Sequence, residues 1–331
     1  MFVHSTRLPH VLSPDCYWSA EQHARELDVL FRPGWHLAGT IDELARSGSF
    51  LTLDVLGHPV RLDNREGRWQ ACSSFCDPLR VEQCGRLLFV SLDAGAPSLT
   101  DSLGDHYATL AAACGPGWRP VWSHSLDLEA NWKVPLENSV ESYHIPAVHP
   151  QTFKATPEAE RITHVLEPRW TSFQVTRAAH SRIETLLFTL DDGLLRWLGR
   201  TPTCGYTHYH FFPNLVLSST DTTSLCLSFT PLAPQRCRAC IRMFAYEGER
   251  TGWLQRQACR AWGLLNRALG ELVLSEDFRI YPAIQRGLAA SRQPGCLGAI
   301  EERIYAFQQY IAKQCSPGGG LNRPAQDAVK V

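Results

Sequence analysis

NWKVPLENSVESYHIPAVHP, residues 131–150, sets two histidines five residues apart and places an acid three residues before the first. Residues three apart share one face of a helix, so we expect Glu141 beside His144. Pro146 disfavours a helix just before it, so a helix should end near His144 and a turn should bring His149 back. Two imidazoles joined by one distant carboxylate would form the facial triad that holds Fe(II) with open coordination positions.

The flanking residues decide between a metal site and a structural histidine pair, which the spacing alone leaves open. The stretch reads Asn-Trp-Lys, then Glu-Asn, then an acid, Tyr-His and a second His. It closely resembles the mononuclear-iron motif of Rieske non-haem iron oxygenase alpha subunits, the aromatic-ring-hydroxylating dioxygenase family. The resemblance implies that His144 and His149 bind a mononuclear Fe(II). Tyr143 is expected to pack rather than to act in catalysis.

The third ligand of that family comes from a late helical segment with a Glu-Asp pair followed by Gln-Arg-Gly-Leu. This chain has Glu276 and Asp277 ahead of that tetrapeptide at 285–288. By this resemblance Asp277 is the matching carboxylate ligand and Glu276 is the less favoured one. The alternative for both acids is a solvated helix face.

The resemblance gives Glu141 a catalytic role. It occupies the position of the acid that links the cluster histidine of a neighbouring subunit to the iron ligand. A carboxylate there would also orient His144 through its free ring nitrogen.

The clearest departure from the family lies in the N-terminal third of the chain. A Rieske [2Fe–2S] centre needs two cysteines and two histidines, which the family supplies as Cys-x-His and Cys-x-x-His. Neither pattern occurs in this sequence. Cys76 stands where the first cysteine should be, and Pro78 stands in place of its histidine. The segment 81–92 then resembles the strand that follows the cluster lobe, so we expect a shortened lobe without a cluster in this chain.

A mononuclear iron needs electrons from another redox centre. Because the family resembled here forms rings in which one subunit's cluster serves its neighbour's iron, we predict a trimer-based hetero-oligomeric ring with an intact Rieske oxygenase homologue. A reductase or ferredoxin would supply electrons to that external Rieske centre.

The predicted function is that of an O2-dependent oxidoreductase, a mononuclear non-haem Fe(II) oxygenase subunit that hydroxylates, dealkylates or similarly oxidises a small organic substrate. One alternative is a non-catalytic scaffold or regulatory subunit of a hetero-oligomeric Rieske oxygenase. Another is a hydrolase in which zinc at the same site polarises water. The sequence does not identify the substrate.

Composition agrees with a cytoplasmic protein. The formal net charge of −1 gives no reason to expect nucleic acid or an anionic membrane as a partner. No basic region precedes an apolar core at the N-terminus, and no run approaches the roughly 18 apolar residues of a membrane span. The 12 cysteines are expected as reduced, mostly buried thiols. A zinc site from Cys72, Cys76 and Cys84 lacks a convincing fourth ligand.

The remaining patterns predict an α+β fold. Alternating runs at 163–175, 207–219, 224–231 and 237–246 favour an antiparallel sheet, and apolar residues at helical spacing over 253–273 favour a long helix that delivers Asp277 near its end. The family resemblance implies a helix-grip, START-like catalytic domain. His208 and His210 share a strand face and are not assigned as ligands.

These patterns and the resemblance predict four parts of the chain. These are an N-terminal helical segment (1–45), a degenerate, shortened Rieske-like β lobe (46–100), a mononuclear iron catalytic domain (101–315) and a flexible tail (316–331).

Overall fold

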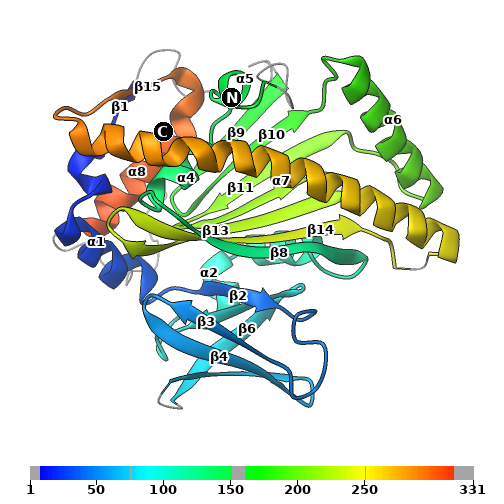
Figure 1. Cartoon of the computed structure of the whole chain (residues 1–331), viewed down its shortest axis with the longest axis horizontal. Helices are drawn as coiled ribbons and strands as arrows, with labels where there is room; N and C mark the ends of the chain where they lie inside the picture. The colour runs from blue at the N-terminus through cyan, green and yellow to red at the C-terminus, as the bar shows by residue number, and fades with distance from the viewer. Residues whose placement is uncertain (1–7, 75–76, 151–160, 250, 317–331) are drawn as a thin grey trace.

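A computed structural model of the protein describes residues 8–74, 77–150, 161–249 and 251–316. These residues form two large antiparallel sheets and a separate two-stranded one. Figure 1 shows the smaller of the two large sheets below the larger one, with the long helix α7 running across the larger. Cys76 and all but the first residue of the predicted tail lie outside the described residues.

The larger sheet has seven strands, each antiparallel to its neighbours. More and less buried side chains alternate over residues 236–241 and 207–210, as the period of two in the sequence predicted, whereas residues 241–245 are all buried. The strands, in their order across the sheet, are β8 (Trp118–Leu128), β14 (Arg236–Tyr246), β13 (Thr223–Ala233), β12 (Leu215–Ser219), β11 (Gly205–Phe211), β10 (Trp170–Thr176) and β9 (Ile162–Glu167).

Helix α7 (Trp253–Ala290) packs against β14 and β8. Gly263 allows this close approach, because a Cβ atom there would lie 2.9 Å from Ala245 Cβ and 3.0 Å from Val121 Cγ1. The helix is longer than predicted and continues through Pro282. Asp277 therefore lies within the helix and not at its end.

The other helices surround this sheet and α7. Helix α8 packs on β9 and β10, α4 packs on α7 and β13, and α6 contacts α7. Their bounds are η1 (Pro14–Tyr17), α1 (Ala20–Glu26), η2 (Leu27–Phe31), α2 (Leu99–Leu103), α3 (His106–Ala113), α4 (Lys133–Ser139), α5 (Ile145–Val148), α6 (Arg182–Trp197), η4 (Ala299–Glu301) and α8 (Glu302–Cys315).

The smaller sheet contains the region predicted as a shortened lobe. It begins at His36, inside the segment that the sequence assigned to N-terminal helices, so that segment contributes both helices and a strand. Its strands, in order, are β2 (His36–Thr40), β7 (Leu87–Ser91), β6 (Pro78–Cys84), β5 (Arg68–Ser73), β4 (His58–Arg65) and β3 (Phe50–Val55), and β1 (Leu8–Pro9) pairs separately with β15 (Cys296–Leu297).

The main core lies between the larger sheet and the helices on its face. A buried ion pair crosses this core, because Lys133 Nζ lies 2.7 Å from Glu26 Oε1 and both side chains are fully buried. Trp132 Nε1 donates to the same carboxylate at 2.7 Å. The N-terminal helix α1 is thereby tied to the start of α4, which leads into the histidine segment.

The structure confirms the predicted α+β fold class, because it combines helices with antiparallel sheets and has a long helix across the larger sheet. Among the described residues, no helix is both long and apolar enough to cross a membrane.

Candidate metal centre

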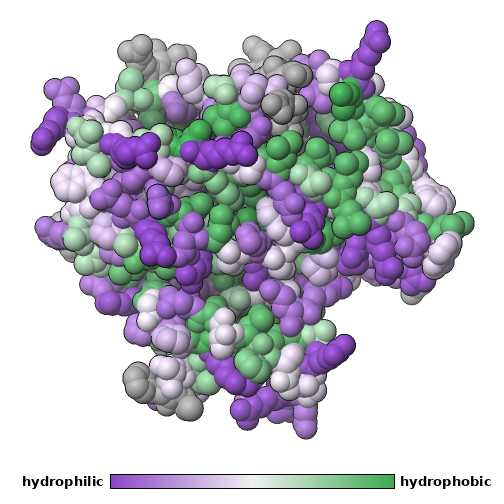
Figure 2. Space-filling model, in the orientation of Figure 1, coloured by the Kyte–Doolittle hydropathy of each residue, from purple (hydrophilic) through white to green (hydrophobic). Residues whose placement is uncertain are grey.

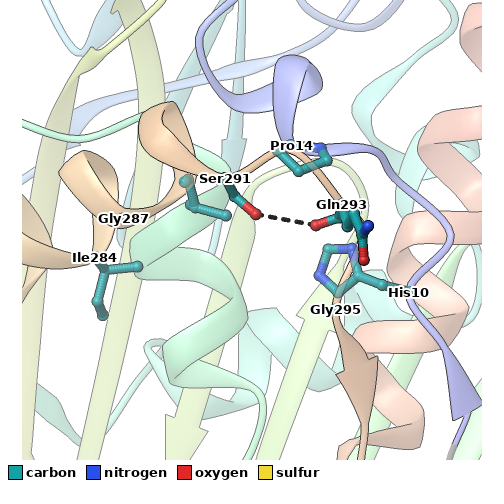
Figure 3. A pocket seen from close by; sticks show the side chains of 8 residues that line it. His10, Pro14, Ile284, Gly287, Ser291, Gln293 and Gly295 are labelled. Atoms are coloured by element: carbon teal, nitrogen blue, oxygen red, sulfur yellow. Dashed lines mark hydrogen bonds between the residues drawn. The ribbon is translucent and has the colours of Figure 1, made fainter.

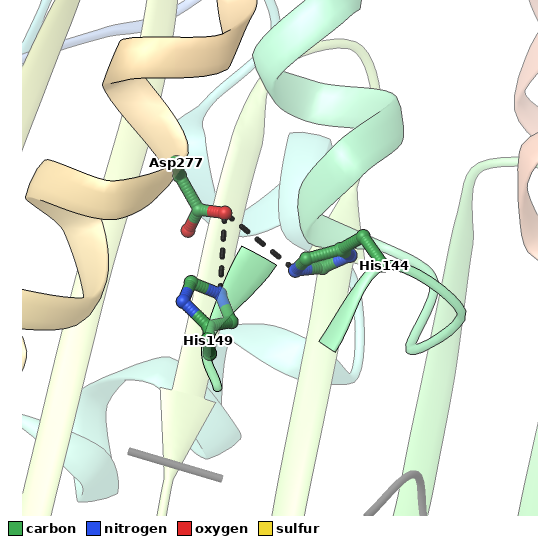
Figure 4. A group of neighbouring side chains, drawn as sticks. All are labelled: His144, His149 and Asp277. Atoms are coloured by element: carbon green, nitrogen blue, oxygen red, sulfur yellow. Dashed lines mark ion pairs between the residues drawn. The ribbon is translucent and has the colours of Figure 1, made fainter. Parts of the chain in front are cut away.

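Two distant segments bring the predicted ligands together. His144 precedes α5, His149 directly follows it, and Asp277 projects from α7 (Figure 4). Asp277 Oδ1 lies 3.6 Å from His144 Nε2 and 3.2 Å from His149 Nε2. The two imidazole rings have centroids 5.2 Å apart and are inclined at 73°.

The local chain path differs from the predicted one. Helix α4 ends at Ser139, well before His144, and Pro146 lies in the first turn of α5. Proline is tolerated in a first helical turn, where backbone N–H groups have no partner within the helix. The short helix α5, and not a simple turn, returns His149 to the site.

These distances fit one shared cation. Two ligands bound side by side to an ion at roughly 2.1 Å each are about 3 Å apart, close to the observed nitrogen-to-oxygen separations. Within the described parts of the chain, His144, His149 and Asp277 form the one group of at least three metal-ligating side chains whose ligand atoms lie within 4.8 Å of one another. Two imidazoles and a carboxylate suit Fe(II) and leave coordination positions open.

Each histidine has its own carboxylate on the ring nitrogen that faces away from Asp277. Glu141 Oε1 contacts His144 Nδ1, as the three-residue spacing predicted. Glu276 Oε2 lies 2.8 Å from His149 Nδ1. A carboxylate that accepts from Nδ1–H leaves the Nε2 lone pair free for a metal.

Sequence reasoning missed two polar residues of this site. Asn138 Nδ2 donates to Asp277 Oδ1 at 3.0 Å and to Tyr281 Oη at 3.3 Å. Asn138 belongs to the recognised Glu-Asn pair, but its partner on a distant helix had no signal in the sequence. Burial, reinforced by the charge of Asp277, raises the pKa of Tyr281 well above its ordinary value and keeps it a neutral phenol.

The carboxylates around the site favour a positive charge on the groups beside them. Burial by itself lowers the pKa of His149, but hydrogen bonds to Asp277 and Glu276 outweigh that effect, so its pKa is raised. A bound cation would satisfy the same carboxylates.

Tyr143 is 70 % exposed, so the expectation that it packs was wrong.

The other predicted positions lie away from the triad. Pro78 opens β6 and pairs with Cys72 of β5. Cys84 is fully buried, and burial raises the pKa of its thiol to about 12, which disfavours the thiolate that zinc requires. His208 and His210 are buried on β11, where Arg303 Nη2 approaches His208 Nδ1 at 3.1 Å and His210 Nε2 donates to the Pro213 carbonyl at 2.9 Å.

Known proteins resemble this chain, one of them along most of its length and others over shorter parts. Choline monooxygenase of Atriplex hortensis is 21 % identical over 363 aligned residues, which cover 91 % of this chain and 77 % of that protein. The carnitine monooxygenase oxygenase subunit of Acinetobacter baumannii is 30 % identical over 96 residues, 28 % of this chain and 26 % of that protein. The glycine betaine monooxygenase oxygenase subunit of Pseudomonas aeruginosa is 23 % identical over 201 residues, 43 % of this chain and 46 % of that protein.

Solved structures share the fold. A quaternary ammonium Rieske monooxygenase superposes with a TM-score of 0.71 at 17 % identity, covering 93 % of this chain and 96 % of that one. Another structure of that type of enzyme, at 15 % identity and a TM-score of 0.71 over 95 % and 96 % of the two chains, is described as giving insight into inter-subunit electron transfer. A naphthalene 1,2-dioxygenase superposes with a TM-score of 0.66 at 13 % identity over 93 % and 92 %.

The sequence model for the ring hydroxylating alpha subunit (catalytic domain) matches residues 117–317, a span that contains both histidines, Asp277 and all seven strands of the larger sheet. The chain therefore belongs to the family of ring hydroxylating alpha subunits, which are oxidoreductases, and carries that family's catalytic domain.

Proposed function

We propose that this chain is a mononuclear non-haem Fe(II) oxygenase subunit that oxidises a small organic substrate with O2, using electrons from a Rieske centre on a partner. The observation that carries this proposal is the convergence of His144, His149 and Asp277 from two distant segments, with a separate carboxylate on the second nitrogen of each histidine.

The proposed ligand atoms are the two Nε2 atoms and Asp277 Oδ1. Fe(II) held there would offer open positions for O2 and, once electrons arrive, the means to oxidise a substrate C–H bond. Glu141 and Glu276 hold the imidazoles with their Nε2 lone pairs toward the ion. Asn138 donates to Asp277 Oδ1 and so limits rotation of that carboxylate.

The electron source is proposed to lie outside the chain. The sequence contains neither of the Cys-x-His and Cys-x-x-His patterns that hold a Rieske cluster. An intact homologue in a ring-shaped hetero-oligomer would supply the cluster, and Glu141 would lie on the electron path to His144. The four-part division of the chain, with 46–100 as a degenerate lobe, belongs to the same proposal.

The first test is to measure iron and acid-labile sulfide in the chain purified alone after expression with iron. We expect about one iron per chain and no stoichiometric sulfide. The variants His144→Ala and Asp277→Ala should lose the iron, whereas His58→Ala, which changes an exposed histidine on β4, should retain it. Iron with stoichiometric sulfide would contradict the absence of a cluster.

Turnover separates a catalytic subunit from a scaffold. Choline, carnitine and glycine betaine are suitable first substrates, because relatives are named for acting on them. In a complex reconstituted with an intact homologue and a reductase, His144→Ala should abolish the turnover that depends on this chain. Unchanged turnover would favour the scaffold function, and substrate hydrolysis without O2 or reductant would favour a zinc hydrolase.

A further inference from the structure

Helix α6 turns one face toward the fold and another toward solvent. Its inner face contains the buried Leu195 and Asp191, and Asp191 accepts hydrogen bonds from Trp262 Nε1 at 2.9 Å and from Arg177 Nη1 at 2.7 Å. Its outer face contains a row of large apolar side chains that are each more than half exposed. They are Ile183, Leu186, Leu190 and Trp197.

The spacing of this outer row is typical of helix pairing. Steps of three, four and seven residues place Ile183, Leu186, Leu190 and Trp197 at alternating positions of a seven-residue repeat, with Gly193 at the remaining position. A Cβ atom on Gly193 would have no neighbour within 4 Å. The row therefore contains an open gap that a large side chain of a facing helix can enter. The apolar face of an amphipathic helix is normally buried.

The first third of α7 has exposed apolar side chains as well. Gln255 Nε2 donates to the Trp197 carbonyl at 2.7 Å and so joins the end of α6 to α7. Trp253, Leu254 and Leu264 are again more than half exposed. Figure 2 shows a hydrophobic area, green, over α6 and the neighbouring middle part of α7. We call these seven residues the α6–α7 face.

The α6–α7 face is large enough for a stable interface. Its residues have exposed fractions from 51 % to 71 %. Together they expose about 800 Å², taking roughly 200 Å² for one fully exposed residue of this size, which is about what each partner buries in a standard interface.

Charge indicates which partner would cover it. The charged side chains that α6 and the first three turns of α7 leave exposed are all arginines, namely Arg182, Arg196, Arg256 and Arg260, of which Arg260 also pairs with Glu247 at 4.0 Å. The acids of α6 have local partners: Asp191 and Asp192 pair with Arg177, and Glu184 accepts from the His180 backbone. An antiparallel pairing of two copies along α6 would bring Arg182 of one copy near Arg196 of the other, which is unfavourable.

We propose that the α6–α7 face is a docking surface for an amphipathic helix of a partner protein, whose apolar seam is flanked by Asp and Glu side chains. The apolar seam would fill the row over Gly193 while the acids meet the four arginines. This proposal is independent of the iron site and of the proposed reaction.

The test uses two designed helical peptides of about three heptads with the same Leu/Ile seam, one flanked by Glu and the other by Lys. Binding to the full chain is measured by fluorescence anisotropy at low and high salt. We expect the Glu-flanked peptide to bind at least about tenfold more tightly than the Lys-flanked one, and to weaken as salt rises. Equal binding of the two peptides, or no binding, would overturn the proposal.

Variants locate the binding and exclude a second copy. Leu186→Glu combined with Leu190→Glu should abolish binding while iron content stays unchanged, and Arg182→Glu combined with Arg196→Glu should reverse the peptide preference. Phe50→Asp, which changes an exposed apolar residue of the smaller sheet, should bind like the unmodified chain. If sedimentation shows self-association that the leucine variant abolishes, the occupant is a second copy and the proposal fails.

Discussion

Each proposed histidine ligand has a carboxylate on Nδ1 and turns Nε2 toward Asp277. The carboxylate contact is local for His144, whose Nδ1 contacts Glu141 three residues earlier, and long-range for His149, whose Nδ1 contacts Glu276. The sequence favoured Asp277 over Glu276 as the ligand, and the structure gives Glu276 a distinct contact on the far side of the imidazole. Glu276 is therefore a positioning residue in the proposed site.

Glu276→Gln should weaken iron binding by about 10- to 100-fold, because an amide holds the Nδ1–H of His149 less strongly than a carboxylate does. Iron affinity, measured by competition with a chelator, is the readout. Glu271→Gln is the matched control, since Glu271 lies on the same helix and pairs with Arg267 in solvent. Equal loss of affinity in both variants would assign the effect to helix charge and not to positioning.

At the scale of elements, the buried pair between Glu26 and Lys133 connects α1 to α4. The Asn-Trp-Lys motif was recognised by resemblance, and its two long side chains both reach the Glu26 carboxylate. Asn138, which donates to Asp277, lies in the same helix α4. The buried pair therefore holds one of the helices that contribute to the site.

Lys133→Met should lower the free energy of unfolding by about 3–5 kcal/mol, because it leaves the Glu26 carboxylate buried without its cation. The double variant Glu26→Gln with Lys133→Met should be more stable than Lys133→Met alone, since neither charge remains. Urea denaturation provides the values. Arg267→Met, which breaks an exposed pair, should cost less than about 1 kcal/mol; a similar cost for the two single variants would refute the prediction.

At the scale of the whole molecule, His36 lies where the smaller sheet meets the N-terminal helices. Its ring nitrogen Nε2 donates to the Phe31 carbonyl at 2.9 Å. Burial lowers the pKa of His36 from 6.5 to about 4, although this hydrogen bond opposes the shift. Burial likewise lowers the pKa of His208 and His210 in the main core.

Stability should therefore fall in acid. Above about pH 6.5 His36 is neutral in both the folded and the unfolded chain, and its contribution is fully present. As the pH falls toward about 4, the unfolded chain binds a proton that the folded chain excludes, which removes on the order of 3 kcal/mol.

The variant His36→Gln, which lacks this titration, should lose less stability than the unmodified chain when urea denaturation is repeated from about pH 7.5 to about pH 5. Its stability at the higher pH sets the baseline for the comparison. Parallel curves for the two proteins would show that His36 does not control the acid sensitivity.

The sequence by itself determined the fold class, and it was enough to propose His144, His149 and Asp277 as iron ligands and to predict the contact between Glu141 and His144. Alternation and helical spacing are local properties of a sequence. Glu141 and His144 are only three residues apart, so their contact is local as well. The missing Cys-x-His and Cys-x-x-His patterns can also be read directly from the chain.

Only the tertiary structure decided that Glu276 holds His149 across 127 residues, that Asn138 reaches Asp277, and that α6 presents an apolar row to solvent. The physical reason is that such contacts depend on how whole helices pack. Local periodicity identifies the apolar positions of α6, but which of its faces the sheet and α7 cover is settled when the elements come together.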